Sequence, residues 1–347
     1  MHSGDRAVTA RLGAAILGCA GTALSAEERA FFRGANPFGF ILFDRNIASA
    51  GQLRSLTADL REAVGRDAPV FIDQEGGRVQ RLRPPLARSW TPPLDFVADY
   101  GALALRAMYL RYRIIAAELR GYGIDGNCAP TLDVARPTTH AVLRNRCYGS
   151  SLGTVVAVGR AVAQALLDGG VLPVIKHMPG HGLAEIDSHL DLPRVTAGRE
   201  TLESLDFAAF RPFADMPLGM TAHLVFDAYD TRPATISTRM ISYIRGSLGF
   251  DGLLMTDDIS MQALSGTVAQ RGASALAAGC DVVLHCNGDL AEMTDLMDRA
   301  GAMSDAAQQR AEAALARRVT PPDVDIAALA ADLEALSNQR GNERRPV

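Results

Sequence analysis

Short, strongly apolar segments alternate with amphipathic segments along most of the chain. The apolar segments carry few charged residues and are bounded by polar or glycine-rich stretches, which is the pattern of parallel strands covered on both faces. Each of them is predicted to be a buried β-strand. They comprise residues 12–19, 38–43, 69–72, 127–134, 171–175, 218–225, 252–256 and 281–286.

The segments between these strands have apolar residues at helical spacing. One begins at Ser25, where Glu28 three residues later completes a capping box. The others comprise residues 49–64, 102–121, 152–169, 201–214, 237–248, 261–279 and 290–300. Eight strand–helix units predict one closed (β/α)8 barrel of the TIM type, because an open doubly wound sheet usually has fewer strands. We expect a single catalytic domain over residues 1–337 and a charged tail at residues 338–347 that frays.

Composition and charge fit a soluble enzyme with a large core. The chain has 347 residues, of which 48% are hydrophobic, and a net charge of −4. It has no basic stripe or block, so nucleic acid is a poor candidate partner. The five cysteines are odd in number and show no CxxC spacing. Because four of them lie in or beside apolar segments, we expect free, buried thiols and a cytoplasmic protein.

The N-terminal region superficially resembles a secretion signal at residues 10–21, ARLGAAILGCAG. Its apolar run is short and rich in Gly and Ala, and Asp5 beside Arg6 makes a weak basic region before it. We therefore predict a buried first strand. No other segment approaches the roughly 18 apolar residues that a membrane span requires, so no membrane association is expected.

Catalytic residue types are concentrated in residues 176–189, KHMPGHGLAEIDSH, directly after an apolar strand. Pro179 and the two nearby glycines exclude a regular helix, so the segment is predicted to be a shaped loop. Imidazoles titrate near neutrality, which suits them to proton transfer. Within the loop, Asp187 and His189 are two residues apart and form the best candidate acid/base pair, since the carboxylate can orient and tune the imidazole.

Polar residues lie at or just after the ends of seven of the eight predicted strands, where a (β/α)8 barrel carries its active site. Asp257 ends the run GLLMT and is the best candidate nucleophile. One carboxylate that attacks and one group that transfers protons are sufficient for glycoside hydrolysis. For Asp44, Arg45, Asp133 and Asp258 we favour capping or ion-pair roles. Gly76 and Gly77 are interpreted as a turn, and Trp90 is as compatible with bracing a loop as with stacking on a sugar.

Two other classes of function are compatible with parts of the pattern. A zinc-dependent barrel hydrolase would use the HxxxH spacing of His177 and His181 together with His189, Asp187 and Asp257. Pro179 and Gly180 disfavour this alternative, because they break the helix that would direct such a histidine pair at one metal ion. A sugar-binding protein without activity would be expected to lack Asp257 or the Asp187/His189 pair, and this chain has both.

The motifs also resemble those of a known family. They are FIDQEGGRVQRL (71–82), NCAPTLDV (127–134), NRCYG (145–149), KHMPGHG with DSH downstream, MTAHLVF (220–226), GFDGLLMTDDISM (249–261) and AGCDVVLHCN (278–287). In this order they closely resemble the bacterial β-N-acetylglucosaminidases of glycoside hydrolase family 3, the NagZ type. The resemblance covers residues 12–300.

The resemblance implies a single-barrel, cytoplasmic enzyme of cell-wall recycling. We expect it to be a monomer and to need no cofactor and no metal. It would remove terminal N-acetylglucosamine from 1,6-anhydromuramoyl fragments by a retaining mechanism. Asp257 would be the nucleophile and Asp187/His189 the acid/base dyad. Met178 stands where the family usually has Phe. Two alternatives stay open: phosphate rather than water could accept the sugar, and the enzyme could be specific for β-glucosides. The sugar would be bound by Asp73, Arg81, Arg146, Lys176 and His177.

Overall fold

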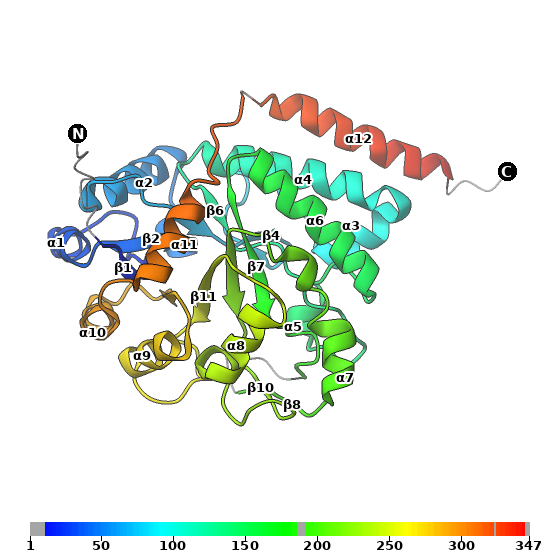
Figure 1. Cartoon of the computed structure of the whole chain (residues 1–347). Coiled ribbons are helices and arrows are strands. Elements are labelled where there is room, and N and C mark those ends of the chain that lie inside the picture. The colour runs from blue at the N-terminus through cyan, green and yellow to red at the C-terminus, as the bar shows by residue number, and fades with distance from the viewer. Residues whose placement is uncertain (1–10, 186–191, 323, 344–347) are drawn as a thin grey trace, which may run out of the picture.

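The computed structural model describes residues 11–185, 192–322 and 324–343. In this part of the chain, eight parallel strands close into a barrel in the order β1-β12-β11-β9-β7-β6-β3-β2, and helices surround it (Figure 1). The predicted (β/α)8 fold is confirmed. The barrel strands are β1 (Gly13–Gly18), β2 (Pro37–Leu42), β3 (Val70–Ile72), β6 (Gly126–Asn127), β7 (Leu172–Met178), β9 (Leu218–Thr221), β11 (Leu253–Asp258) and β12 (Val282–His285).

Each barrel strand overlaps one of the predicted apolar segments, although β6 is much shorter than predicted. Pro130 has no N–H to donate to a ladder, so regular pairing does not continue beyond Asn127. An isolated bridge between Thr131 and Lys176 keeps the chain beside β7. The first strand, β1, is buried along its whole length and pairs with β12 to close the barrel, which confirms the prediction for residues 12–19.

The segments predicted to be helical are present with two differences, and the described residues also contain helices at 93–100, 141–144, 305–315 and 326–343 that were not predicted. The capping box of Ser25 and Glu28 is present. Residues 201–214 do not form one regular helix, because Pro212 cannot donate within it, and they form instead a π-helical turn and the 3-10 turn Arg211–Phe213. The helix expected from residue 261 begins at Val268. It begins there because Gly266, with φ +89°, is not helical and Thr267 caps the helix with a capping box.

The helix bounds complete this description (Figure 1). They are α1 (Ala26–Ala35), α2 (Ala50–Val64), α3 (Pro93–Tyr100), α4 (Ala104–Arg120), α5 (Ala141–Arg144), α6 (Leu152–Asp168), α7 (Arg199–Thr201), α8 (Thr238–Gly246), α9 (Val268–Ala278), α10 (Leu290–Ala300), α11 (Asp305–Leu315) and α12 (Ile326–Glu343). Helix α12 packs against α4 and continues into the segment expected to fray.

The core has two layers, as alternation along the strands requires. In β1, Ala15 and Leu17 pack toward the helices, whereas Ala14 and Ile16 join an inner cluster with side chains from the other barrel strands. Helix α11 contributes Ala307 and its neighbours to this inner cluster. Because the residues before α11 pair with the start of β1, α11 covers the N-terminal end of the barrel and leaves the C-terminal end for the site.

Two short sheets lie outside the barrel. Strands β4 (Gln74–Gly76) and β5 (Val79–Gln80) form an antiparallel hairpin directly after β3, and β8 (Arg194–Val195) pairs with β10 (Val225–Phe226). The β4–β5 hairpin is important for the site, because it carries charged side chains back toward the strand ends.

Candidate active site

The C-terminal ends of the strands surround a cavity of about 570 Å³. Its wall is formed by the ends of β3, β7, β11 and β12 and by the loops that follow them, where barrels of this type carry active sites. All described residues of the predicted site line this one cavity, and they are Asp73, Arg81, Arg146, Lys176, His177 and Asp257.

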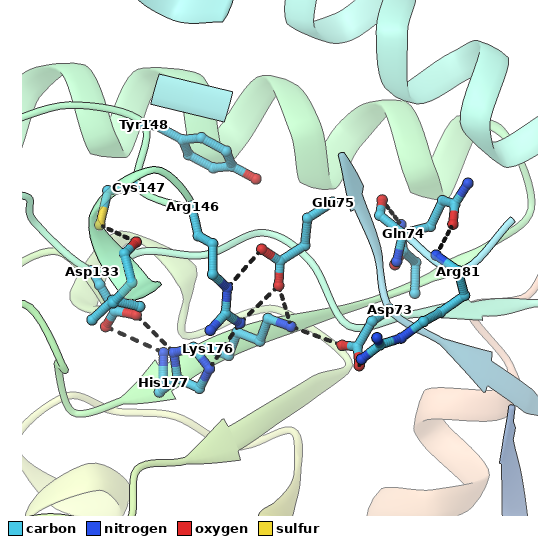
Figure 2. A network of polar contacts seen from close by, with 12 residues as sticks. Asp73, Gln74, Glu75, Arg81, Asp133, Arg146, Cys147, Tyr148, Lys176 and His177 are labelled. Atoms are coloured by element: carbon cyan, nitrogen blue, oxygen red, sulfur yellow. Dashed lines mark hydrogen bonds and ion pairs between the residues drawn. The ribbon is translucent and has the colours of Figure 1, made fainter. Parts of the chain in front are cut away.

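A network of four acidic and basic side chains forms one wall of the cavity and the layer behind it (Figure 2). Lys176 Nζ lies 3.0 Å from Asp73 Oδ1 and 2.6 Å from Glu75 Oε1. Arg146 donates through Nε and Nη2 to the two oxygens of Glu75, at 2.9 and 2.8 Å. Arg81 Nη2 extends the network by donating to Asp73 Oδ2 at 3.1 Å. The alternating charges therefore fix Lys176 and Arg146, two of the cations that line the cavity.

The surroundings keep these groups ionised. Burial raises the pKa of Asp73 and of Glu75, but the adjacent cations outweigh it and hold both pKa values below their ordinary range. Burial lowers the pKa of Lys176, but the two carboxylates outweigh it and hold that pKa above its ordinary value. The network is thus a set of charges at neutral pH, paired before any ligand binds.

His177 is held in one orientation by Asp133. The ring Nδ1 lies 2.7 Å from Asp133 Oδ2, and the nitrogen is the donor because a carboxylate only accepts. Asp133 is completely buried, and its pKa is lowered because His177 outweighs the effect of burial. The other carboxylate oxygen accepts from the backbone N–H of His181 at 2.7 Å. Asp133 therefore anchors both His177 and the start of the predicted catalytic loop, beyond the simple ion-pair role that the sequence indicates.

Asp257 lies at the end of β11 with its carboxylate at the cavity wall. Its Oδ1 accepts from the backbone N–H of Asp258 at 2.8 Å. Burial raises its pKa, but His177, His223 and this N–H outweigh it, so the pKa lies below the ordinary value and the group is a carboxylate at neutral pH. His223 supports the same end of β11, since its Nε2 lies 3.0 Å from the carbonyl oxygen of Asp258.

Asp187 and His189 lie outside the described residues, so the acid/base dyad stays a prediction. The part of the same loop that is described is held to the barrel: Thr139 Oγ1 donates to the carbonyl oxygen of Gly182 at 2.6 Å. The Lys176–His177 peptide bond is cis.

Arg45 and Asp258, for which we favoured structural roles, also line the cavity, whereas Trp90, for which two roles were open, does not. Arg45 donates to the carbonyl oxygens of Cys19 and Cys286 and so joins the ends of β1 and β12, but it also lines the cavity. Asp258 accepts from Ser260 Oγ at 2.6 Å and also lines the cavity. Trp90 does not line it. Its ring packs against Phe96 and Arg111, so it braces the third loop.

Glu75 is the residue that sequence reasoning did not include in the site. The available signal was its position in the polar sequence Asp73-Gln74-Glu75 at the end of a predicted strand. Its side chain is only 2% exposed and contacts both Arg146 and Lys176.

Among the residues that the structure describes, no cluster of three or more His, Cys, Asp or Glu side chains is placed to hold a metal ion. All five cysteines lie in described segments, and they are free and buried, as predicted. None of the described helices combines the length and the apolar composition needed to cross a membrane.

A (β/α)8 barrel with an ionised carboxylate and fixed cations at its mouth is compatible with glycoside hydrolysis. The sequence profile of the glycosyl hydrolase family 3 N terminal domain matches residues 14–320. The chain belongs to glycosyl hydrolase family 3.

Known relatives agree with this assignment. A beta-hexosaminidase from Alkalilimnicola ehrlichii is 38% identical over 284 residues, which cover 80% of this chain and 81% of that protein. NagZ from Neisseria gonorrhoeae in complex with N-trifluoroacetyl-D-glucosamine has a TM-score of 0.79 at 29% identity, covering 97% of this chain and 99% of that one. Its structure is also known in complex with zinc ion. A family 3 beta-N-acetylglucosaminidase from Paenibacillus sp. has a TM-score of 0.76 at 30% identity. The match covers 96% of this chain and 62% of that chain. The predicted resemblance to the NagZ type is confirmed.

Proposed function

We propose that the protein is a retaining exo-β-N-acetylglucosaminidase that releases terminal N-acetylglucosamine from (1,6-anhydro)muramoyl fragments in cytoplasmic cell-wall recycling. The observation that carries the proposal is that the Asp257 carboxylate lines the same cavity as Lys176 and Arg146, two cations that are each paired with Glu75. The names of the relatives support the choice of sugar, because they include beta-hexosaminidases and a NagZ bound to an N-acylated glucosamine.

In the proposed reaction, Asp257 attacks the anomeric carbon and forms a covalent glycosyl-enzyme, which water then hydrolyses. The low pKa of Asp257 supports this role, since a nucleophile must be ionised at the working pH. Lys176, Arg146 and His177 bind the sugar together with Asp73 and Arg81. Asp187 orients His189, which protonates the leaving group in the first step and activates water in the second.

Product analysis tests the reaction. The purified enzyme is given a chromogenic β-N-acetylglucosaminide, the corresponding β-glucoside and a GlcNAc-anhydromuramoyl fragment, each with and without phosphate. We expect hydrolysis of both N-acetylglucosaminides with the β-anomer of the sugar formed first. Preference for the plain glucoside would refute the proposed sugar specificity, and a sugar 1-phosphate product would make the enzyme a phosphorylase.

Substitutions test the roles. Asp257→Ala is expected to abolish turnover for every leaving group, and azide is expected to restore activity with inverted product. Asp251→Ala is the matched control, because Asp251 lies two residues before the start of the same strand and its side chain is 92% exposed. His189→Ala is expected to spare the first step on a nitrophenyl substrate but to reduce it by about 10²–10⁴-fold on a sugar leaving group. Asp187→Ala is expected to show a milder version of the same pattern. Equal losses of His189→Ala on both leaving groups would contradict the assignment.

A further inference from the structure

Glu75 combines deep burial with a position behind the cavity wall. It belongs to β4 and is not among the residues that line the cavity, whereas its partners Arg146 and Lys176 both are. Its side chain is 2% exposed. A buried carboxylate in such a place is stable only if charged or hydrogen-bonding partners compensate for the lost water.

Two cations use both oxygens of this carboxylate. Oε1 accepts from Lys176 Nζ at 2.6 Å and from Arg146 Nη2 at 2.8 Å, and Oε2 accepts from Arg146 Nε at 2.9 Å. The contact to Arg146 is a bidentate pair, which fixes the plane of the guanidinium as well as its position. Lys176 has a second carboxylate partner in Asp73. For Arg146, Glu75 is the one carboxylate partner within the described part of the chain.

The backbone of Glu75 is fixed from the other side. Its carbonyl oxygen accepts from Arg111 Nη2 and from the hydroxyl of Tyr112 at 3.4 Å, both on the buried face of α4. Arg111 is fully buried and lies against the rings of Trp90 and Phe96. Helix α4 is thereby connected to the wall of the cavity through one residue.

We propose that Glu75 is the positioning residue that holds Arg146 and Lys176 in the geometry that binds the sugar, without contacting the sugar itself. This inference rests on the proposed function, since it takes both cations as sugar ligands. Without the Glu75 carboxylate, Arg146 loses its bidentate partner. Its Nη2 would then be left with His177 Nε2, 3.4 Å away, as its nearest described acceptor.

Sugar affinity is the quantity that tests the proposal. Glu75→Gln keeps the side-chain shape but replaces one acceptor oxygen with a donor group. We expect KM for the chromogenic N-acetylglucosaminide, and Ki for free N-acetylglucosamine, to rise together by about 10- to 100-fold, with a smaller change in kcat. Asp44→Asn removes the same charge from an exposed carboxylate 3.8 Å from Arg81 and is expected to change both constants by less than about threefold.

Two further variants separate positioning from simple loss of folded protein. A misfolded fraction lowers apparent kcat but leaves KM and Ki unchanged. Glu75→Asp keeps the buried charge but shortens the side chain, and we expect an intermediate rise in both constants. In a double-mutant cycle, Glu75→Gln is expected to cost less in the Arg146→Gln background than in the wild-type enzyme, because Glu75 acts partly through Arg146 and the remaining loss comes from Lys176.

The outcomes are distinct. Unchanged KM and Ki in an active Glu75→Gln enzyme, fully additive losses in the cycle, or failure of both Glu75 variants to fold would overturn the inference alone. A wild-type protein that does not act on N-acetylglucosaminides would refute the proposed function and this inference with it.

Discussion

Glu118 on α4 is a partly buried carboxylate with one hydrogen-bond partner among the described residues. Its Oε1 accepts from the backbone N–H of Arg88 at 2.8 Å, while its buried Oε2 has no hydrogen-bond partner among the described residues. Burial raises the pKa of Glu118 from 4.5 to about 7, against the opposing effect of Arg88. We predict that Glu118→Gln stabilises the protein at alkaline pH, because the amide keeps the bond to Arg88 and removes the charge.

The magnitude follows from linkage. The folded-state pKa of Glu118 lies above the unfolded value, so the folded protein favours the protonated form. Its contribution to stability is fully present below pH 4.5 and is lost as the pH rises through 7. Each pKa unit corresponds to about 1.36 kcal/mol, so ionisation lowers the free energy of unfolding by at most about 3 kcal/mol. Because solvent reaches part of the side chain, we expect about 1–2 kcal/mol at pH 8.

Thermal unfolding at pH 5 and pH 8 measures this difference. We expect Glu118→Gln to raise Tm by roughly 2–4 °C at pH 8 and to change it little at pH 5. The matched control is Glu334→Gln on α12, where the side chain is exposed, and it is expected to leave Tm unchanged at both pH values. An equal shift of Tm at both pH values, or a lower Tm at pH 8, would refute the reasoning.

Three further predictions concern the site and its supports. Asp133→Asn removes the charged partner of His177 Nδ1 and is expected to lower kcat/KM about 10- to 100-fold; kinetics equal to wild type would show that His177 needs no such anchor. Prolonged chelation is expected to leave activity unchanged, because the proposed charge stabilisation comes from side chains; a loss restored by zinc would favour the metal-dependent alternative. Gly76→Ala is expected to lower the free energy of unfolding in urea by about 1–3 kcal/mol, because Gly76 has φ +105° and an added Cβ would overlap Arg111. Gly153→Ala on α6, where a Cβ meets nothing, is expected to raise it by about 0.5–1 kcal/mol; equal effects of the two glycine variants would contradict this account.

Most of the fold could be predicted from the sequence, because each buried barrel strand corresponds to a short apolar segment that can be recognised locally. Each apolar segment is short, and all but the first carry polar residues at or just after their ends. Lys176, His177 and Asp257 directly end two of these segments, so their convergence follows once the barrel is recognised. The broken helix after residue 201 was not predicted, because one internal proline within an otherwise helical pattern decides it.

The residues that support the site, Glu75 and Asp133, are not marked by a comparable local sequence pattern. Glu75 is brought behind the cavity by the β4–β5 hairpin, and its backbone is held by Arg111, which is 36 residues away in the sequence. Asp133 likewise contacts His177 across 44 residues. Burial of a charged side chain depends on which opposite charges the tertiary fold places beside it, and spacing along one segment does not contain that information.

The ion network has a consequence for how the cavity discriminates between ligands. A lysine ammonium has three N–H donors, and Asp73 and Glu75 accept two of those of Lys176. Arg146 likewise gives Glu75 two of the five donors of its guanidinium. The positive charges are compensated by these carboxylates, but donors remain, and each has a direction set by the bonds already made. Such a wall offers little net attraction to an anion and distinguishes neutral molecules by where their oxygen atoms lie. If the wall binds sugars as proposed, two sugars that differ only in the configuration of one hydroxyl are told apart by geometry, with no difference in charge between them.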